Sequence, residues 1–258
     1  MTRLISLLTI SIALIAGAVD WSTIYPTSVS PAVAEYEPVA VVELFTSQGC
    51  SSCPPADQLL GKLVDTAEEQ DQPVYALSFH VAYWNYLGWR DPFSREAFTH
   101  RQRQYAQTLG ESVYTPQMIV NGTSVFVGSK SATVDATVRQ ALRKKAAHSV
   151  ALAAKTVNDS VRVRFKVAGP LDEHVLQIAL VERDLSVDVK RGENGGRTLH
   201  HDNVVRQFNT IALASREGSV SLSLPEKINV KNASLIAYVQ DTKSLTISGA
   251  SRAALSAK

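Results

Sequence analysis

Residues 38–57 have the sequence PVAVVELFTSQGCSSCPPAD, and this stretch carries the strongest structural signal in the chain. Its first part is apolar apart from Glu43, which predicts a buried strand. Cys50 and Cys53 follow, and the residues after them place apolar side chains at the spacings of three and four that are typical of an amphipathic helix. Pro54 and Pro55 suit the first turn of such a helix, where a missing N–H costs little. The stretch therefore predicts a strand, a Cys-x-x-Cys motif and a helix in direct succession.

The segments that follow continue this alternation up to about residue 148. The patterns predict a strand at Val74–Phe79, a helix capped by Ser94 and ending at Leu109 before Gly110, a hairpin of Gln117–Val120 and Thr123–Val127 around Asn121-Gly122, and a third helix around Val134–Leu142. The resulting order of strands and helices is that of the thioredoxin fold. We therefore predict an α/β thioredoxin-like domain over residues 38–148, with the first two strands parallel.

The pattern changes in the second half of the chain. Val161, Val163, Phe165 and Val167 alternate with charged residues, which is typical of a strand with one face in solvent. Similar alternation recurs further on, between segments rich in turn residues, and no helix of useful length is indicated. Residues 149–258 are therefore predicted to form an antiparallel, all-β, sandwich-like domain.

The first residues have the pattern of an export signal. Arg3 precedes an apolar run from Leu4 to Ala16, and small residues follow, so residues 1–18 are predicted to be a signal peptide. An uncleaved anchor is the alternative, although the run is shorter than the roughly 20 residues that a spanning helix needs. Residues 19–37 are interpreted as a linker. We expect the protein to be exported, to the periplasm or the extracellular space.

Charge and cysteine content restrict the function further. The formal net charge is only +2, which gives no indication of nucleic-acid binding. The chain has two cysteines, so a four-cysteine metal site is excluded. A structural disulfide gains most from closing a long loop, and a bond between Cys50 and Cys53 would close almost none. The pair is therefore interpreted as redox-active, with no cofactor.

The expected helix supplies the chemistry that such a pair requires. Cys50, at the start of the helix, would be the nucleophile because the positive end of the helix dipole stabilises a thiolate. Cys53 would be the resolving thiol. Thr115-Pro116 comes just before the third strand, at a position that resembles the cis-proline beside the cysteines of thioredoxin-like folds. There, Pro116 would leave the backbone of Thr115 free to pair with a substrate.

Other side chains are candidates for supporting roles. His80, Tyr83 and Trp84 follow the second strand, and parallel strands place their carboxyl ends at one edge of the sheet. His80 would move protons or orient a thiol, and the aromatic residues would wall a groove. Glu43 would accept the proton of Cys53 if it lay beneath the pair; if it faced a domain interface or solvent, it would be structural.

Several blocks of the sequence resemble the bacterial secreted proteins grouped as domain of unknown function family 1223. The resemblance runs from about Val41 to Arg206. It rests on the blocks Val42–Asp57, Phe79–Val81, Tyr83–Trp84, Tyr86–Trp89, Asp91–Phe93, Arg101–Gln102, Tyr114–Met118, Val120–Gly122 and Arg191–Leu199. It implies a thioredoxin-like domain with an added C-terminal portion and no established reaction. Ala82 and Asn85 depart from the family pattern, which has acidic residues there.

The block from Arg191 to Arg206 combines glycines with dense polar chemistry, including Glu193, Asn194, Arg197, His200 and His201. One interpretation is a solvated hairpin. Our hypothesis is that the block instead packs near the cysteine edge of the first domain, with Arg197 and His200 among its supporting residues.

Three functions are consistent with these patterns. The first is a thiol–disulfide oxidoreductase that acts on protein or small-molecule thiols and disulfides. A membrane redox partner is compatible with this function. The second is a Cu(I) or Zn(II) binding or delivery protein that uses Cys50, Cys53 and His80, with His200 or His201 as a further ligand. The third is a partner-binding module with a non-catalytic disulfide. The sequence indicates neither the substrate nor the oligomeric state.

Overall fold

The computed structural model describes residues 35–255. The segment predicted to be an export signal, and most of the predicted linker, lie outside these residues. Within residues 35–255, no helix is both long and apolar enough to cross a membrane.

The first half of the described chain alternates strands and helices. Its elements are β1 (Ala40–Thr46), α1 (Pro54–Glu69), β2 (Val74–His80), the 3₁₀ turn η2 (Asn85–Leu87), α2 (Glu96–Leu109), β3 (Gln117–Val120), β4 (Ser124–Val127) and α3 (Ser131–Ala141). The order matches the one predicted from periodicity.

The second half consists of strands with a single 3₁₀ turn. These are β5 (Ser149–Val157), β6 (Ser160–Ala168), β7 (His174–Glu182), β8 (Leu185–Asp188), β9 (Thr198–His201), β10 (Val204–Ala212), β11 (Glu217–Ser223), η3 (Val230–Asn232), β12 (Ala233–Asp241) and β13 (Ile247–Ala254). Strand β6 alternates buried and exposed residues, as its sequence predicts.

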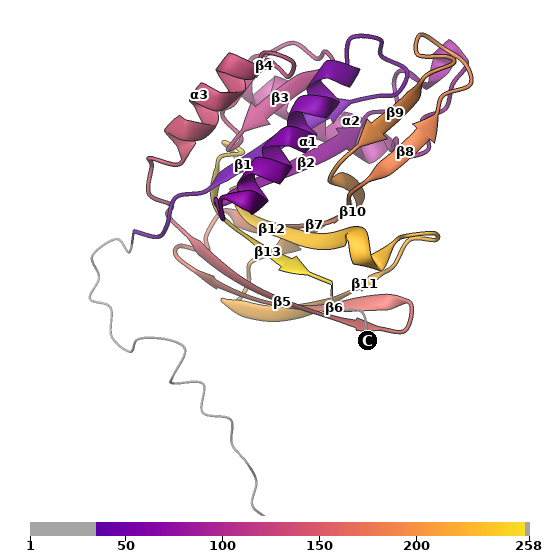
Figure 1. Ribbon diagram of the computed structural model, residues 1–258. Helices are drawn as coiled ribbons and strands as arrows, with labels where there is room; N and C mark the ends of the chain where they lie inside the picture. Colours follow the sequence, from indigo (N-terminus) through magenta and orange to yellow (C-terminus); the bar gives the residue numbers. More distant parts are fainter. Residues whose placement is uncertain (1–34, 256–258) are drawn as a thin grey trace, which may run out of the picture. The chain divides into compact units, whose positions relative to one another are not determined.

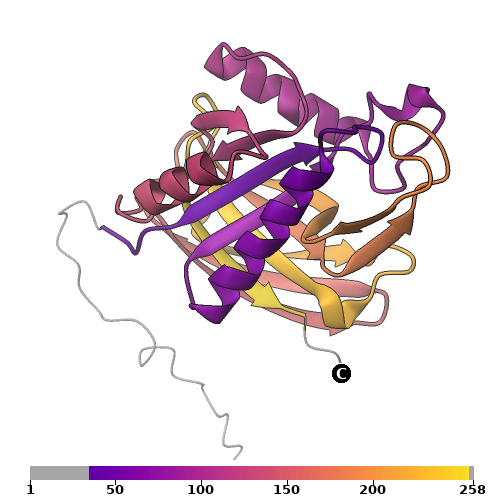
Figure 2. The ribbon, with the colours of Figure 1, turned by 45° about the horizontal axis from the view of Figure 1, so that its top comes forward.

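Strand β1 is buried along its whole length because both of its faces are covered. Val42 and Leu44 pack against the apolar residues of α1 and α3. Val41 and Phe45, on the opposite face, pack against α2 and the inner strands of the second half. Figure 2 shows α1 in front of β1 and α2 behind it. The carboxyl end of β1, where the cysteines follow, is therefore held between layers.

Two local predictions can be compared directly with the structure. Asn121 and Gly122 both have positive φ values, 48° and 72°, and the hairpin of β3 and β4 forms around them as predicted. Ser94 is not the N-cap of α2. Arg95 occupies that position in an extended conformation, while the Ser94 hydroxyl donates to the backbone oxygen of Asp91. Gly110 ends α2 in the left-handed conformation, as its position indicated.

A single eight-stranded sheet, in the order β13-β12-β7-β10-β2-β1-β3-β4, runs through both halves of the chain. Strand β1 pairs in parallel with β2, and β10 joins the outer edge of β2 through the pairing of Val204 with Ser78. The protein is thus a mixed α/β protein with one large sheet and few helices. The boundary expected at residues 148 and 149 does not separate two sheets.

A smaller sheet, in the order β11-β6-β5, covers the part of the large sheet that the second half supplies. Side chains of β6 and β11 share one apolar cluster with side chains of β7 and β12. Figure 1 shows this sheet on the side of β7, β12 and β13 that faces away from α1. The second half therefore has the two stacked layers expected of a sandwich, but one layer continues into the first half.

Candidate functional site

Cys50 and Cys53 form a disulfide between the end of β1 and the start of α1. Their Cα atoms lie 5.5 Å apart. Cys53 is the N-cap residue of α1, and Pro54 and Pro55 occupy its first positions, as predicted. The Sγ of Cys50 lies 3.4 Å from the hydroxyl of Ser52. Both cysteines are buried, at 1% and 0% exposure, while Ser51 and Ser52 between them are exposed.

A loop between β8 and β9 covers this disulfide. The side-chain amide of Asn194 donates to the backbone oxygens of Gln48 and Cys50, at 3.0 Å in each case. The backbone N–H of Ser51 donates to the carboxylate of Glu193 at 2.9 Å. Arg197 donates to the side-chain oxygen of Asn194, which is fully buried. We call Glu193 and Asn194 the cap. The hypothesis that the block from Arg191 packs near the cysteine edge is confirmed.

Aromatic residues and the predicted proline approach the motif from other directions. The peptide bond between Thr115 and Pro116 is cis. Because Phe45 pairs with Gln117, Pro116 lies at the level of the end of β1. The indole N–H of Trp84 donates to the hydroxyl of Thr115 at 2.8 Å.

Trp84 also packs against the residue that precedes the motif. A Cβ added at Gly49 would lie only 2.9 Å from the Cβ of Trp84, so this position accepts no side chain without a shift. The ring of Tyr83 lies beside Trp84, with 6.2 Å between the ring centroids. The structure therefore brings the predicted pair Tyr83 and Trp84 to the cysteine motif.

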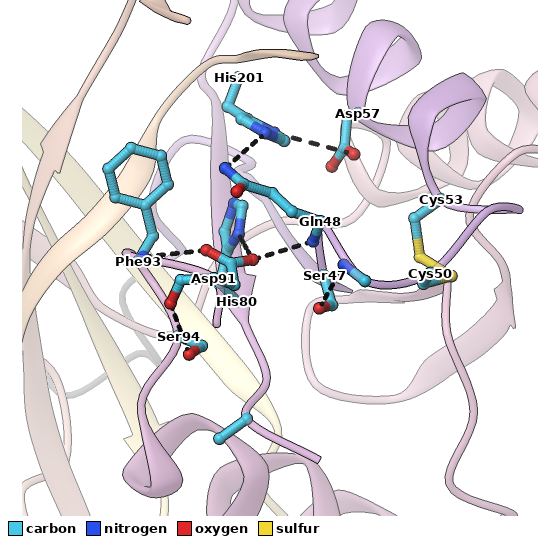
Figure 3. A network of polar contacts seen from close by, with 12 residues as sticks. Ser47, Gln48, Cys50, Cys53, Asp57, His80, Asp91, Phe93, Ser94 and His201 are labelled. Atoms are coloured by element: carbon cyan, nitrogen blue, oxygen red, sulfur yellow. Dashed lines mark hydrogen bonds and ion pairs between the residues drawn. A yellow bond between two sulfur atoms is a disulfide. The ribbon is translucent and has the colours of Figure 1, made fainter. Parts of the chain in front are cut away.

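A buried cluster of titratable side chains lies beside the disulfide (Figure 3). The Nδ1 of His80 lies 2.7 Å from a carboxylate oxygen of Asp91, and the same oxygen accepts from the backbone N–H of Gln48. The rings of His80 and His201 are 4.7 Å apart, edge to face. Asp57, on α1, lies 3.8 Å from the Nδ1 of His201. All four titratable residues are at least 95% buried, with exposures from 0% to 5%.

The proton on His201 can be placed from its neighbours. The indole N–H of Trp89 donates to the side-chain oxygen of Gln48, which fixes the orientation of that amide. The amide nitrogen of Gln48 then faces the Nε2 of His201 at 3.2 Å and must donate to it. A neutral His201 therefore carries its proton on Nδ1, on the side of Asp57.

Burial and neighbouring charges shift the pKa values of this cluster in opposite directions. Burial raises the pKa of Asp57 to about 7, although the charge of His80 and the Thr46 hydroxyl act to lower it. Burial also lowers the pKa of His201 to about 3, and the charge of His80 adds to this effect. The carboxylate of Asp91 raises the pKa of His80 despite burial, and His80 in turn holds the pKa of Asp91 below its usual value.

Glu43 does not lie with the cysteines. Its carboxylate accepts two hydrogen bonds from Arg101 and others from Tyr105 and Tyr238. Tyr238 belongs to β12, so Glu43 lies in the interface where the first half of the chain meets the second. The structural alternative for Glu43 is therefore the correct one.

Two further candidates differ from expectation. His200 is exposed on the outer side of β9 and contacts Ser186, because neighbouring residues of a strand point to opposite faces. His201 is the histidine that enters the cluster. His80 contacts Asp91 rather than a sulfur, and within residues 35–255 no group of three or more His, Cys, Asp or Glu residues is arranged to hold a metal. The alternative metal site of Cys50, Cys53 and His80 needs free thiols and stays a prediction, because here the two cysteines are bonded to each other.

The sequence reasoning missed Asp57, Asp91 and Gln48 as members of the cluster. Asp57 left a signal, because it lies four residues after Cys53 and therefore on the same face of the helix. No sequence pattern indicated Asp91 or Gln48, because both lie in loops whose course the tertiary structure decides. Asn85 accepts from the backbone N–H of Asp91 and helps to position it.

Comparisons with known proteins place the chain in a family without an assigned activity. The model of the family described as "Protein of unknown function (DUF1223)" matches residues 41–240. A solved structure of a protein from Agrobacterium tumefaciens is 31% identical, with a TM-score of 0.63 over 85% of this chain and 95% of that chain. HBP35 of Porphyromonas gingivalis is similar in fold, at 15% identity and a TM-score of 0.64, over 86% of this chain and 76% of that chain. No curated protein matches the chain.

Proposed function

The chain belongs to the family of proteins of unknown function DUF1223, and from its cysteine site we propose that it is a thiol–disulfide oxidoreductase acting on protein or small-molecule thiols and disulfides. The observation that carries the proposal is the disulfide between residues only three apart at the start of α1. Such a bond closes too short a loop to contribute much to stability. Its position at a helix N-terminus favours a thiolate on reduction.

The surroundings of the pair support a thioredoxin-like assignment. The elements from β1 to α3 have the order of that fold, and the cis peptide bond before Pro116 lies at the level of the end of β1. The hydroxyl of Ser52 can donate to a thiolate at Cys50, which favours Cys50 as the nucleophile. Cys53 is fully buried and caps α1, as a resolving thiol would.

The reaction is a two-electron exchange. The thiolate of the reduced Cys50 attacks a substrate disulfide, one substrate sulfur leaves as a thiolate, and the other remains bonded to Cys50. The sulfur of Cys53 then attacks Cys50, so that the Cys50–Cys53 bond forms and the second substrate thiolate leaves. The protein is oxidised and the substrate is reduced; the reverse sequence oxidises a substrate dithiol.

Access to Cys50 requires the cap to move. Glu193 and Asn194 occupy the backbone groups around the motif, and Cys50 is only 1% exposed. A substrate would displace these contacts and replace them with its own backbone groups, beside Thr115.

The proposed setting is outside the cytoplasm. Residues 1–18 have the pattern of a signal peptide, and disulfides persist in oxidising compartments. A protein exported in this way would meet folding substrates with exposed thiols, or a membrane partner that supplies electrons.

Trapping tests the proposal. In the variant Cys53→Ser, a substrate attacked by Cys50 remains attached because the resolving sulfur is missing. Expressed with its own leader, this variant should yield mixed disulfides that run as larger species on non-reducing gels and disappear with reductant. Cys50→Ser is the matched control and should trap nothing.

Two results would contradict the proposal. One is an equal absence of adducts in both variants. The other is a redox titration that gives a potential below about −300 mV together with a bridge inert to thiols, which is the behaviour of a structural disulfide.

A further inference from the structure

The carboxyl group of Asp57 is buried in a way that a purely structural role does not explain. Asp57 is 5% exposed, and among residues 35–255 neither carboxyl oxygen has a partner with good hydrogen-bond geometry, although the Thr46 hydroxyl is close enough to lower the pKa of Asp57. A buried polar group without a partner costs free energy, and a buried charge costs more. By contrast, Glu43, which is equally buried, accepts bonds from an arginine and two tyrosines. An unpartnered carboxyl next to a disulfide therefore calls for a chemical explanation.

Helix geometry places Asp57 one turn after the resolving cysteine, on the same face of α1. The backbone N–H of Asp57 donates to the backbone oxygen of Cys53 at 3.1 Å, which is the bond of one helical turn. Side chains four residues apart lie on one face of a helix, with Cβ atoms about 5–6 Å apart. Figure 3 shows Asp57 one turn along α1 from Cys53, with its carboxyl group directed toward His201 and the sulfur of Cys53 bonded to that of Cys50.

The groups that face Asp57 come from every element packed around it. They are Thr46 at the end of β1, His80 at the end of β2, Asp91 in the following loop and His201 on β9. One turn further along α1, Asp202 lies against Gly61 and is 3.6 Å from Arg183. Burial raises the pKa of Asp57 to about 7, against the lowering effects of His80 and Thr46, and this value suits a group that takes up and returns protons near neutral pH.

We propose that Asp57 is the proton acceptor and donor for Cys53 in the exchange reaction. This inference rests on the proposed function. When Cys53 attacks the mixed disulfide on Cys50, its thiol proton passes to the carboxylate of Asp57. When the pair is reduced again, the sulfur of Cys53 leaves as a thiolate and takes that proton back. The two thiolates released from the substrate take their protons from solvent.

A coloured aromatic disulfide separates the two steps. The reduced protein should release one aromatic thiolate in a bimolecular step, by attack of Cys50, and a second in a unimolecular step, by attack of Cys53. Asp57→Asn should slow the second release at least about tenfold near neutral pH and leave the first within about twofold. In the wild type the second rate should rise with pH through about 7, and this inflection should be absent in Asp57→Asn.

Two further variants control for structural effects. Asp57→Glu keeps a carboxyl group and should recover part of the second rate. Glu69→Gln removes an exposed carboxylate from the same helix and should change neither step. The pH profile of the wild type also tests the proposal by itself, whether or not Asp57→Asn folds.

The outcomes are distinguishable. If no aromatic thiolate is released at all, the proposed function fails, and the inference fails with it. If both are released but the second step has no inflection near pH 7, or is equally fast in Asp57→Asn, the inference alone is overturned.

Discussion

In the wild type, the pH dependence of stability that comes from Asp57 should cancel the one that comes from His201. Substituting Asp57 should therefore make the contribution of His201 measurable. Asp57 has its pKa raised to about 7 in the folded protein, and His201 has its pKa lowered to about 3. Between about pH 4.5 and 6, the unfolded chain therefore carries an ionised aspartate and a protonated histidine, whereas the folded protein keeps both neutral. Folding takes up a proton at one residue and releases one at the other.

The two contributions have equal size and opposite sign in this window. For Asp57, the folded state binds the extra proton, so its contribution to stability falls as pH rises. For His201, the unfolded state binds the extra proton, so its contribution rises with pH. Each contributes about 1.4 kcal/mol per pH unit, and the two cancel. In Asp57→Asn only the His201 contribution remains, and stability should rise by about 2 kcal/mol between pH 4.5 and 6, relative to the wild type.

Urea unfolding of the oxidised proteins measures this difference. The free energy of unfolding should be determined for wild type and variant at several pH values across the window, and only the difference interpreted, because all other titrating groups are shared. His80 and Asp91 do not disturb the comparison. The pKa of His80 is raised, so the stability that His80 contributes is lost only as pH rises above the usual range of a histidine. The pKa of Asp91 is lowered, so the stability that Asp91 contributes is lost only as pH falls below the usual range of an aspartate.

The companion variant His201→Gln should show the reverse slope, with stability falling as pH rises. For each variant, the quantity to follow is its free energy of unfolding minus that of the wild type. If this difference does not change between about pH 4.5 and 6 for either variant, the two residues titrate in the folded protein as they do in the unfolded chain. The description of Asp57 and His201 as a mutually neutral buried pair would then be wrong.

Two other changes test the cap and the interface. Asn194→Ala removes two hydrogen bonds to the motif, each worth about 0.5–1.5 kcal/mol, so reduction of the disulfide by a small thiol should become about tenfold faster. Alkylation of the released thiols, followed over time, measures this rate. His200→Ala, an exposed change on β9, is the control. Equal rates in Asn194→Ala and the wild type would show that the cap does not limit access to the disulfide. Glu43→Gln leaves the buried Arg101 without a counter-charge and should cost about 3–5 kcal/mol in urea unfolding, while the thiols of the folded protein react as before. A loss below about 1 kcal/mol would show that Arg101 finds other compensation in its contacts with Tyr105, Tyr238 and Gln240.

The elements of the first half were predictable because each depends on short-range patterns. The apolar run before Cys50, the helical spacing after Cys53 and the Asn121-Gly122 turn all specify local backbone geometry. The N-cap of α2 was not predicted correctly. The hydroxyl of Ser94 bonds instead to the backbone oxygen of Asp91 and contacts Asn85, contacts that belong to the site loop and override its capping preference.

Glu43 shows why a correct strand prediction did not give a correct role. The apolar run predicted a buried strand that contains Glu43, but the sequence does not state what covers the face on which Glu43 lies. The structure covers it with α2 and β12, and Arg101 then satisfies the charge. The large sheet that brings β12 there depends on pairings between strands far apart in the sequence, such as that of Val204 on β10 with Ser78 on β2.

The sequence alone determined that Cys50 and Cys53 lie between a buried strand and a helix, since hydrophobic periodicity and turn chemistry act over a few residues. Only the tertiary structure decided that Asn194 covers the pair and that His201, rather than His200, lies beside Asp57. Those contacts depend on the register of β9 and on how the second half joins the edge of β2. A shift of one residue in a strand exchanges its two faces, so no local pattern could select between the two histidines.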